Sequence, residues 1–178
     1  MTVLYWLPTE TEHGRTEARL TAAAADYTGL PPEDGRLAAA RENGRPFFRG
    51  YPGLYCSVTH SGGVWLCALS GSPVGVDLQQ SENRDILKIA ARFFRPEETE
   101  WLRRNPSRFF EVWCAKESYV KYTGEGLAGL DGFSVIRNGG LAAEVSGAAL
   151  RLIPFQRGYT LCLCGGEGAP DLRRLEMN

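Results

Sequence analysis

The chain has 178 residues, which is enough for one domain or for two small halves that share a core. Its composition, 43% hydrophobic and 23% charged, is typical of a globular protein and not of a disordered one. The formal net charge of −1 gives no general electrostatic attraction to nucleic acid or to an acidic membrane. No apolar run approaches the roughly 20 residues that a spanning helix needs, and the N-terminus has no signal-peptide pattern. We therefore expect a cytoplasmic protein that binds neither nucleic acid nor membrane.

The cysteines give no sign of a disulfide framework or of a zinc finger. There are five of them, an odd number, and no two form a C-x-x-C pair. We expect all five to be small buried side chains. They are Cys56, Cys67, Cys114, Cys162 and Cys164.

The chain begins with a predicted strand and two predicted helices. TVLYWL, residues 2–7, has the character of a short strand, and the alanine-rich segment 15–27 predicts a helix. We predict a second short helix around residues 33–42, because Asn43-Gly44 is a good C-terminal stop for a helix.

Three strands are predicted next. Residues 54–60 (LYCSVTH) and 64–69 (VWLCAL) flank a glycine-containing turn, and this pattern predicts a hairpin. Residues 73–79 (PVGVDLQ) predict a third strand, which begins after the turn SGSP.

Helices follow, and then short strands. Residues 85–94 predict a helix, and Pro96 begins another that has two glutamates in its first turn, where negative charge is favoured. Asn105-Pro106 predicts the start of a longer helix that runs to about Thr123. Four strand-like segments, separated by glycine-containing turns, complete the chain: 133–137, 142–146, 149–154 and 159–164.

This order of elements predicts an α+β fold. Each half has helices and a small antiparallel sheet, and the first half gives way to the second near residues 75–81. We therefore expect two similar subdomains, residues 1–76 and 77–178.

The longer helix carries charges on the side where apolar residues gather. Four large apolar side chains lie within about 60° of one direction on a helical wheel and predict the side that faces the core. Lys116 and Glu117 fall inside this sector or at its edge, and Lys121 lies just beyond it. Charged groups are costly to bury unless they are paired or bound to an ion. The apolar residues are Phe109, Phe110, Trp113 and Val120.

Two sets of acidic and basic residues are candidates for chemistry. Asp77 ends an apolar strand, and alternation puts Gln79 on the same face, which suits a hard cation such as magnesium. Alternatively, Asp77 bonds the turn into the next helix. On the helix, Glu117 can complete a metal site or accept a proton, and Lys116 and Lys121 can meet phosphate oxygens. The alternative is an ordinary Glu117–Lys121 pair on a solvated face.

A third candidate site is the segment SVTHSGG. Thr59, His60 and Ser61 precede a glycine-rich turn and offer hydroxyl groups, an imidazole and backbone N–H groups, which suit a phosphate. Turn chemistry alone also explains serine and glycine here. Arg45 and Arg15 are further basic candidates, although a single arginine is usually a solvated surface residue.

Six fragments occur together in the order and approximate spacing of a known family: GRPFF, SVTHSGG, GVDLQQ, RFF, WCAKESYVKYTGEGL and FSV. In these fragments, from about Asn43 to Val135, the chain resembles the 4′-phosphopantetheinyl transferases of the surfactin-synthetase-activating (Sfp-like) type. The most specific part is G-[VI]-D-x-[EQ] followed, 40 residues later (117 − 77), by W-x-x-K-E-x-x-x-K.

The resemblance implies an enzyme of the holo-[acyl-carrier-protein] synthase type. Such an enzyme moves the phosphopantetheine arm of coenzyme A onto a serine of an acyl or peptidyl carrier protein and releases adenosine 3′,5′-bisphosphate. The resemblance implies that Asp77 and Glu117 bind Mg²⁺, with Gln79 beside them, and that Glu117 helps to remove the serine proton. Lys116 and Lys121 would stabilise negative charge on the pyrophosphate, in agreement with the electrostatics of phosphoryl transfer.

The same resemblance assigns residues of the first half to coenzyme A. Thr59 and His60 match a Ser-His pair that contacts the nucleotide phosphates, and Arg45 matches the basic residue of a G-[KR]-P motif that contacts the 3′-phosphate. Arg15 is a further candidate for the 3′-phosphate. Gln79 replaces an acid that many members carry, so we expect weaker magnesium binding.

The family fold is a pseudo-dimer of two α+β halves with coenzyme A in the cleft between them, which implies a monomer here. Two other classes of function stay open on the sequence. One is a non-catalytic module of the same fold that binds coenzyme A or a carrier protein. The other is a different enzyme, either a magnesium-dependent phosphoesterase or a hydrolase that uses Cys56 and His60. Those two residues lie about 13 Å apart on an extended strand, too far for a nucleophile and its base.

Overall fold

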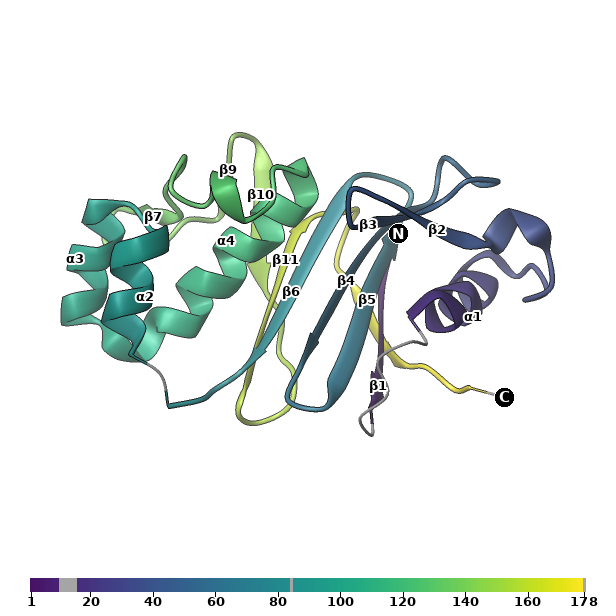
Figure 1. The fold of residues 1–178 in the computed structure, drawn as a ribbon, viewed down its shortest axis with the longest axis horizontal. Coiled ribbons are helices and arrows are strands. Elements are labelled where there is room, and N and C mark those ends of the chain that lie inside the picture. Colours follow the sequence, from purple (N-terminus) through teal and green to yellow (C-terminus); the bar gives the residue numbers. More distant parts are fainter. Residues whose placement is uncertain (10–15, 84, 178) are drawn as a thin grey trace. The chain divides into compact units, whose positions relative to one another are not determined.

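The computed structural model describes residues 1–9, 16–83 and 85–177. By its internal contacts the chain forms two compact units (Figure 1). Unit 1 consists of Met1–Val74 and Gly166–Asn178, and unit 2 consists of Gly75–Gly165. Within the described ranges, no helix has the length and apolar character that a membrane crossing requires.

Unit 1 is a four-stranded sheet with a helix packed on one face (Figure 1). The strand order is β12-β1-β5-β4, and side chains of α1 such as Leu20 pack against Tyr5 of β1 and Trp65 of β5. The elements are β1 (Thr2–Pro8), α1 (Thr16–Thr28), the 3₁₀ turn η1 (Gly35–Leu37), β2 (Ala39–Glu42), β3 (Arg45–Phe48), β4 (Tyr55–Ser61), β5 (Val64–Ser70) and β12 (Asp171–Arg174).

The helix predicted for residues 33–42 is wrong. Only the short turn η1 forms there, and β2 and β3 make an antiparallel hairpin in which Glu42 pairs with Arg45. Its two-residue turn is Asn43-Gly44, with φ of 49° and 80°. Two consecutive residues of positive φ suit the tight turn of a hairpin, and Asn-Gly is its strongest sequence signal. The same dipeptide also ends helices, because a helix end uses the same backbone region.

The end of the chain returns to unit 1. Strand β12 pairs with β1 in parallel, with Val3 opposite Asp171, so this sheet is mixed and not purely antiparallel as expected. The observed units also differ from the predicted division into residues 1–76 and 77–178, since residues after Gly165 belong with the first half. No local sequence pattern predicted that these residues join the first half, because β12 follows a glycine-rich turn and has only four residues.

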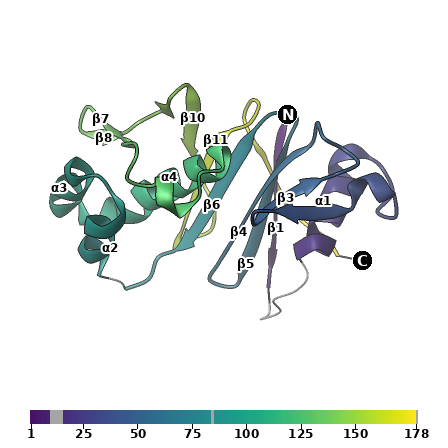
Figure 2. The ribbon, with the colours of Figure 1, turned by 45° about the horizontal axis from the view of Figure 1, so that its top comes forward.

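Unit 2 contains the other helices (Figure 2) and a second four-stranded sheet, of order β6-β11-β10-β9. Helix α4 packs on β11 and β10, and α2 packs on α3. The elements are β6 (Val74–Gln80), α2 (Ile86–Phe93), α3 (Pro96–Arg104), η2 (Pro106–Arg108), α4 (Phe109–Thr123), η3 (Leu127–Gly129), β7 (Ile136–Arg137), β8 (Gly140–Leu141), β9 (Glu144–Val145), β10 (Ala148–Leu152) and β11 (Tyr159–Gly165). The predicted α+β class is confirmed.

Helix α4 is buried more widely than a single apolar stripe predicts. Every residue from 114 to 120 is buried, whereas Phe110 and Trp113 are only partly buried and lie at the rim of the core. Phe109, Phe94 and Trp113 form an aromatic group with ring centroids about 6 Å apart. The second half of α4 is therefore enclosed on several sides, and its charged residues face protein groups.

The cysteines agree with the expectation from the sequence. All five are free thiols; four are buried, and Cys56 is half-buried. Burial raises the pKa of each thiol, to about 12 for Cys56 and about 11 for Cys162, so none is an activated nucleophile. A hydrolase that uses Cys56 has no support from this environment.

Candidate active site

Strand β6 and helix α4 approach each other closely at Gly75. A methyl group placed on Gly75 would lie 2.0 Å from the carbonyl oxygen of Ser118 and 2.5 Å from the backbone nitrogen of Tyr122. Only a residue without a side chain permits this contact between strand and helix. Glycine at this point therefore brings the polar end of β6 against the charged residues of α4.

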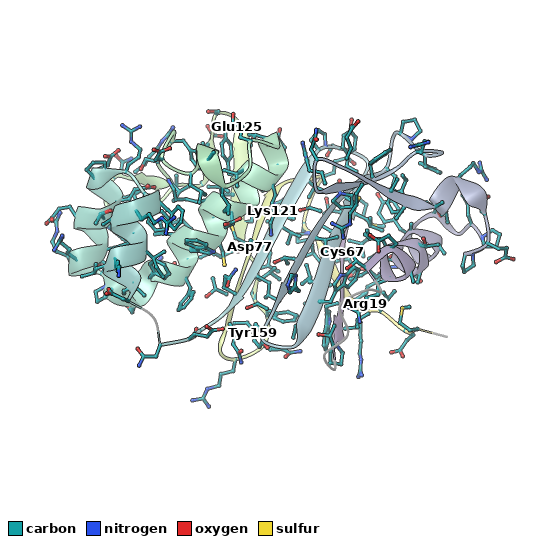
Figure 3. The ribbon with its side chains drawn as sticks, viewed as in Figure 1. Arg19, Cys67, Asp77, Lys121, Glu125 and Tyr159 are labelled. Atoms are coloured by element: carbon teal, nitrogen blue, oxygen red, sulfur yellow. The ribbon has the colours of Figure 1, made fainter. Side chains whose placement is uncertain are left out.

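Asp77 lies at the centre of the resulting cluster. It is only 2% exposed, and the Nζ atom of Lys121 donates to its Oδ1 atom at 2.8 Å and to the carbonyl of Val76 at 3.1 Å (Figure 3). The Nε2 atom of Gln79 donates to the other oxygen, Oδ2, at 3.3 Å. Gln79 therefore lies on the same side of β6 as Asp77, as the alternation of the strand predicts.

Glu117 is the second carboxyl group of this cluster. It is 8% exposed, and burial raises its pKa to about 7, with the negative charge of Asp77 as the second cause. The positive charge of Lys121 acts in the opposite direction. A carboxyl group with a pKa near neutrality can exchange a proton at physiological pH, as a general base must.

The cluster suits a hard divalent cation. Its oxygen donors are two carboxylates and one amide, which are the ligand types that magnesium prefers. Since Asp77 opposes the ionisation of Glu117, a cation between them would favour the ionised form of both. Across the described residues, no three His, Cys, Asp or Glu side chains come together as metal ligands. Water molecules would complete the shell, as is usual for magnesium.

Lys116 does not join this cluster, although the sequence predicted that it contacts a phosphate. Its side chain is fully buried, and its Nζ atom donates to Glu98 Oε2 at 2.6 Å and to the carbonyl of Phe133 at 2.6 Å. The ammonium group also lies 4.4 Å from the ring centroid of Phe133 and 5.4 Å from that of Phe94. Protein groups thus surround the charge. Lys116 points away from the cluster that its neighbour Glu117 joins, because neighbouring residues on a helix point about 100° apart.

The candidates of the first half belong to unit 1. Thr59 and His60 are neighbours on β4, so their side chains point to opposite faces of the sheet; Thr59 is buried and His60 is exposed. Arg45 is exposed at the start of β3. Arg15 lies outside the described residues. Contact of these four with coenzyme A stays a prediction.

Sequence reasoning missed two side chains that contact the candidate residues. Glu98 was interpreted only as a favourable charge in the first turn of α3, whereas it is fully buried and accepts the charge of Lys116. Cys114 lies beside Asp77, whose charge is the second cause, after burial, of its raised thiol pKa. Glu98 is the third residue of α3, counted from Pro96, and a glutamate there is a capping-box signal, which indicated its helix but not its partner.

Comparisons with known proteins identify a family. A sequence model described as the 4′-phosphopantetheinyl transferase superfamily matches residues 73–164, just over half of the chain. The matched region contains Asp77, Gln79, Glu117 and Lys121.

Several curated proteins are similar to this chain. A 4′-phosphopantetheinyl transferase of Bacillus subtilis is 37% identical over 121 residues, which cover 65% of this chain and 53% of that protein. The transferase gsp of Aneurinibacillus migulanus is 37% identical over 101 residues, 54% of this chain and 41% of its own length. The transferase Sfp of Bacillus subtilis strain 168 is 29% identical over 145 residues, 75% of this chain and 63% of its own length.

The chain thus spans about half the length of the curated relatives it matches. The match includes the strand and the helix that carry the acidic cluster. The chain belongs to the 4′-phosphopantetheinyl transferase superfamily.

Proposed function

We propose that this chain is a magnesium-dependent 4′-phosphopantetheinyl transferase. It transfers the phosphopantetheine arm of coenzyme A to a serine hydroxyl of an acyl or peptidyl carrier protein and releases adenosine 3′,5′-bisphosphate. The observation that carries the proposal is the cluster of Asp77, Glu117 and Lys121 on β6 and α4, inside the region that matches the superfamily.

Magnesium would be held by Asp77 and Glu117, with Gln79 or a water molecule beside them. When bound, it would supply positive charge to the pyrophosphate of coenzyme A. Phosphoryl transfer depends mostly on positioning and on stabilising the charge that develops on phosphate oxygens. The remaining tasks fall to side chains of the chain itself.

Glu117 is the proposed base. As a carboxylate it would accept the proton of the carrier serine as the serine oxygen attacks phosphorus. Lys121 is the proposed electrostatic group, because 28% of its side chain is exposed and its ammonium already neutralises Asp77. From that position it would stabilise the negative charge on the departing bisphosphate.

We further infer that Thr59, His60 and Arg45 of unit 1 bind phosphates of coenzyme A, that Arg15 assists them, and that the enzyme acts as a cytoplasmic monomer. The resemblance of SVTHSGG and GRPFF to family motifs supports the phosphate contacts. Single substitutions of His60 and Arg45 by alanine should raise the KM for coenzyme A while leaving kcat nearly unchanged. An unchanged KM for both variants would remove them from the site.

The proposed function is tested by mass spectrometry of a purified apo carrier protein incubated with the chain, coenzyme A and magnesium. We expect a mass gain of one phosphopantetheine, and we expect the gain to be lost with EDTA or with Glu117→Ala. Carrier proteins from fatty-acid, polyketide and nonribosomal-peptide synthesis should be tried in parallel. Binding of coenzyme A without transfer to any of them would identify a non-catalytic binding module instead.

Gln79 gives a specific prediction about magnesium. Gln79→Glu should lower the magnesium concentration needed for half-maximal rate, because it restores a negative oxygen donor next to Asp77. The matched control is Gln80→Glu, which adds the same charge at the next position of β6, on the other face of the strand. Magnesium titrations of the transfer rate compare the two. An equal response of both variants, or none, would contradict a role for Gln79 in the metal site.

A further inference from the structure

The buried ion pair of Glu98 and Lys116 has no role in the proposed reaction. Both side chains are 0% exposed, and they are 18 residues apart on different helices, α3 and α4. A buried ion pair usually adds little net stability, because removing two charges from water costs about as much as their attraction returns. Its best-supported use in proteins is to specify one arrangement of packed elements over others.

Glu98 connects three segments of unit 2 through one carboxylate. Its Oε2 atom accepts from Lys116 Nζ at 2.6 Å and from the backbone nitrogen of Arg95 at 3.1 Å, which closes the first turn of α3. Its Oε1 atom accepts from the backbone nitrogen of Val135 at 2.8 Å. The first turn of α3, the segment that precedes β7 and the middle of α4 are therefore tied to the same group.

Lys116 has the matching set of contacts on α4. Its ammonium bonds Glu98 and the carbonyl of Phe133 and lies over two aromatic rings. Rotation of α4 about its axis, or a shift along it, would break these contacts and leave charges buried without partners. Glu117 is the next residue along the helix. Lys121 lies one turn further on, on the same side of the helix as Glu117.

We propose that the Glu98–Lys116 pair is a positioning device that fixes the rotation and depth of α4, so that Glu117 and Lys121 face Asp77. The inference rests on the proposed transferase activity. Glu98 and Lys116 are positioning residues in this account, since they act through Glu117 and Lys121 and touch neither coenzyme A nor the carrier protein.

The test is a double variant, Glu98→Gln with Lys116→Met. It removes both charges together and keeps an oxygen acceptor for the backbone N–H of Val135, so the fold is expected to remain stable. Each single substitution leaves one buried charge without its partner, and its thermal midpoint should fall by about 10 °C. The double variant should recover most of that loss.

Recovered stability should not restore function. We expect the double variant to show about a tenfold or greater loss of kcat, because a displacement of about 1 Å in a catalytic group can cost up to a hundredfold. The magnesium concentration for half-maximal rate should rise several-fold, and the KM for coenzyme A should change little. Calorimetric titration of magnesium into the protein with coenzyme A, without carrier protein, should show the same loss of affinity.

Val145→Ala is the matched control, because Val145 is buried in the same core and lies on β9, outside the pair and its contacts. It should lower the thermal midpoint but leave kcat and the magnesium dependence within about twofold of the wild type. A folded double variant with wild-type kcat and magnesium affinity would overturn the inference, and so would the same kinetic losses in Val145→Ala. Failure of the proposed function is a separate result, since the wild-type chain would then transfer nothing.

Discussion

Glu117→Gln is expected to reduce phosphopantetheine transfer by at least a hundredfold and, above pH 7, to stabilise the folded chain. The loss of activity follows from the two tasks proposed for this carboxylate, since a positioned general base alone contributes about 10²–10⁴ in rate. The gain in stability follows from its environment, because the ionised form is disfavoured by burial and by Asp77.

The direction of the pH dependence is set by the raised pKa. Glu117 shifts from 4.5 to about 7, so the unfolded chain loses this proton between pH 4.5 and 7 while the folded chain still binds it. The contribution of Glu117 to the free energy of unfolding therefore falls as the pH rises through this window. Above pH 7 the cost is about 3 kcal/mol, and below 4.5 it disappears.

Urea denaturation in EDTA measures this effect at pH 4.5 and at pH 8. We expect Glu117→Gln to exceed the wild type by up to about 3 kcal/mol at pH 8 and to equal it near pH 4.5. The control is Glu100→Gln, which removes an exposed acid of α3 and should change the free energy of unfolding by about 0.5 kcal/mol or less at either pH. A stability difference between Glu117→Gln and wild type that does not vary with pH would show that the carboxyl is not strained in the fold.

Gly75→Ala should destabilise unit 2 by about 3 kcal/mol or more and impair transfer. The added methyl group would lie 2.0 Å from the Ser118 carbonyl oxygen and 2.5 Å from the Tyr122 nitrogen. Both are backbone atoms of a helix and cannot rotate away, so β6 or α4 must move, and overpacking of this kind costs about 1–3 kcal/mol or more. Movement of β6 also displaces Asp77, two residues further along the strand.

Urea denaturation and the carrier-protein transfer assay measure both consequences. The matched control is Gly140→Ala in β8 of the same unit, because a methyl group there meets no atom within 4 Å. That variant should differ from the wild type by about 0.5 kcal/mol or less and transfer at the wild-type rate. A Gly75→Ala protein as stable as the Gly140→Ala protein would mean that strand and helix are not in the contact described.

Local sequence patterns were sufficient to predict the elements whose ends are marked by turn residues or helix-end residues. Strand β6 is an apolar run between two polar turns, and helix α4 begins after Asn105-Pro106 and ends at Gly124, which has φ of 86°. The hairpin of β2 and β3 was missed because Asn43-Gly44 fits a helix end and a tight turn equally well. The antiparallel pairing of β2 with β3 in the tertiary structure decided in favour of the tight turn.

Burial of α4 is the clearest case in which periodicity failed. A wheel assumes one apolar face and one solvated face, and it put Trp113 in the core-facing sector, with Lys116 inside that sector or at its edge. In the structure the helix is enclosed on several sides, so a charged residue on its buried side needs a partner and not solvent. Lys116 found that partner in Glu98, which no sequence period connects with it.

By itself the sequence determined the superfamily, the α+β class and the pairing of GVDLQQ with the helix that carries Glu117 and Lys121. These follow from residue types at set spacings, because the chemistry of a cation and phosphates needs carboxylates and amines on rigid elements. The tertiary structure alone decided the raised pKa of Glu117, the pairing of Lys116 with Glu98 and the parallel pairing of β12 with β1. Each of these depends on contacts between segments distant in the sequence and on the removal of charges from water, which local pattern does not encode.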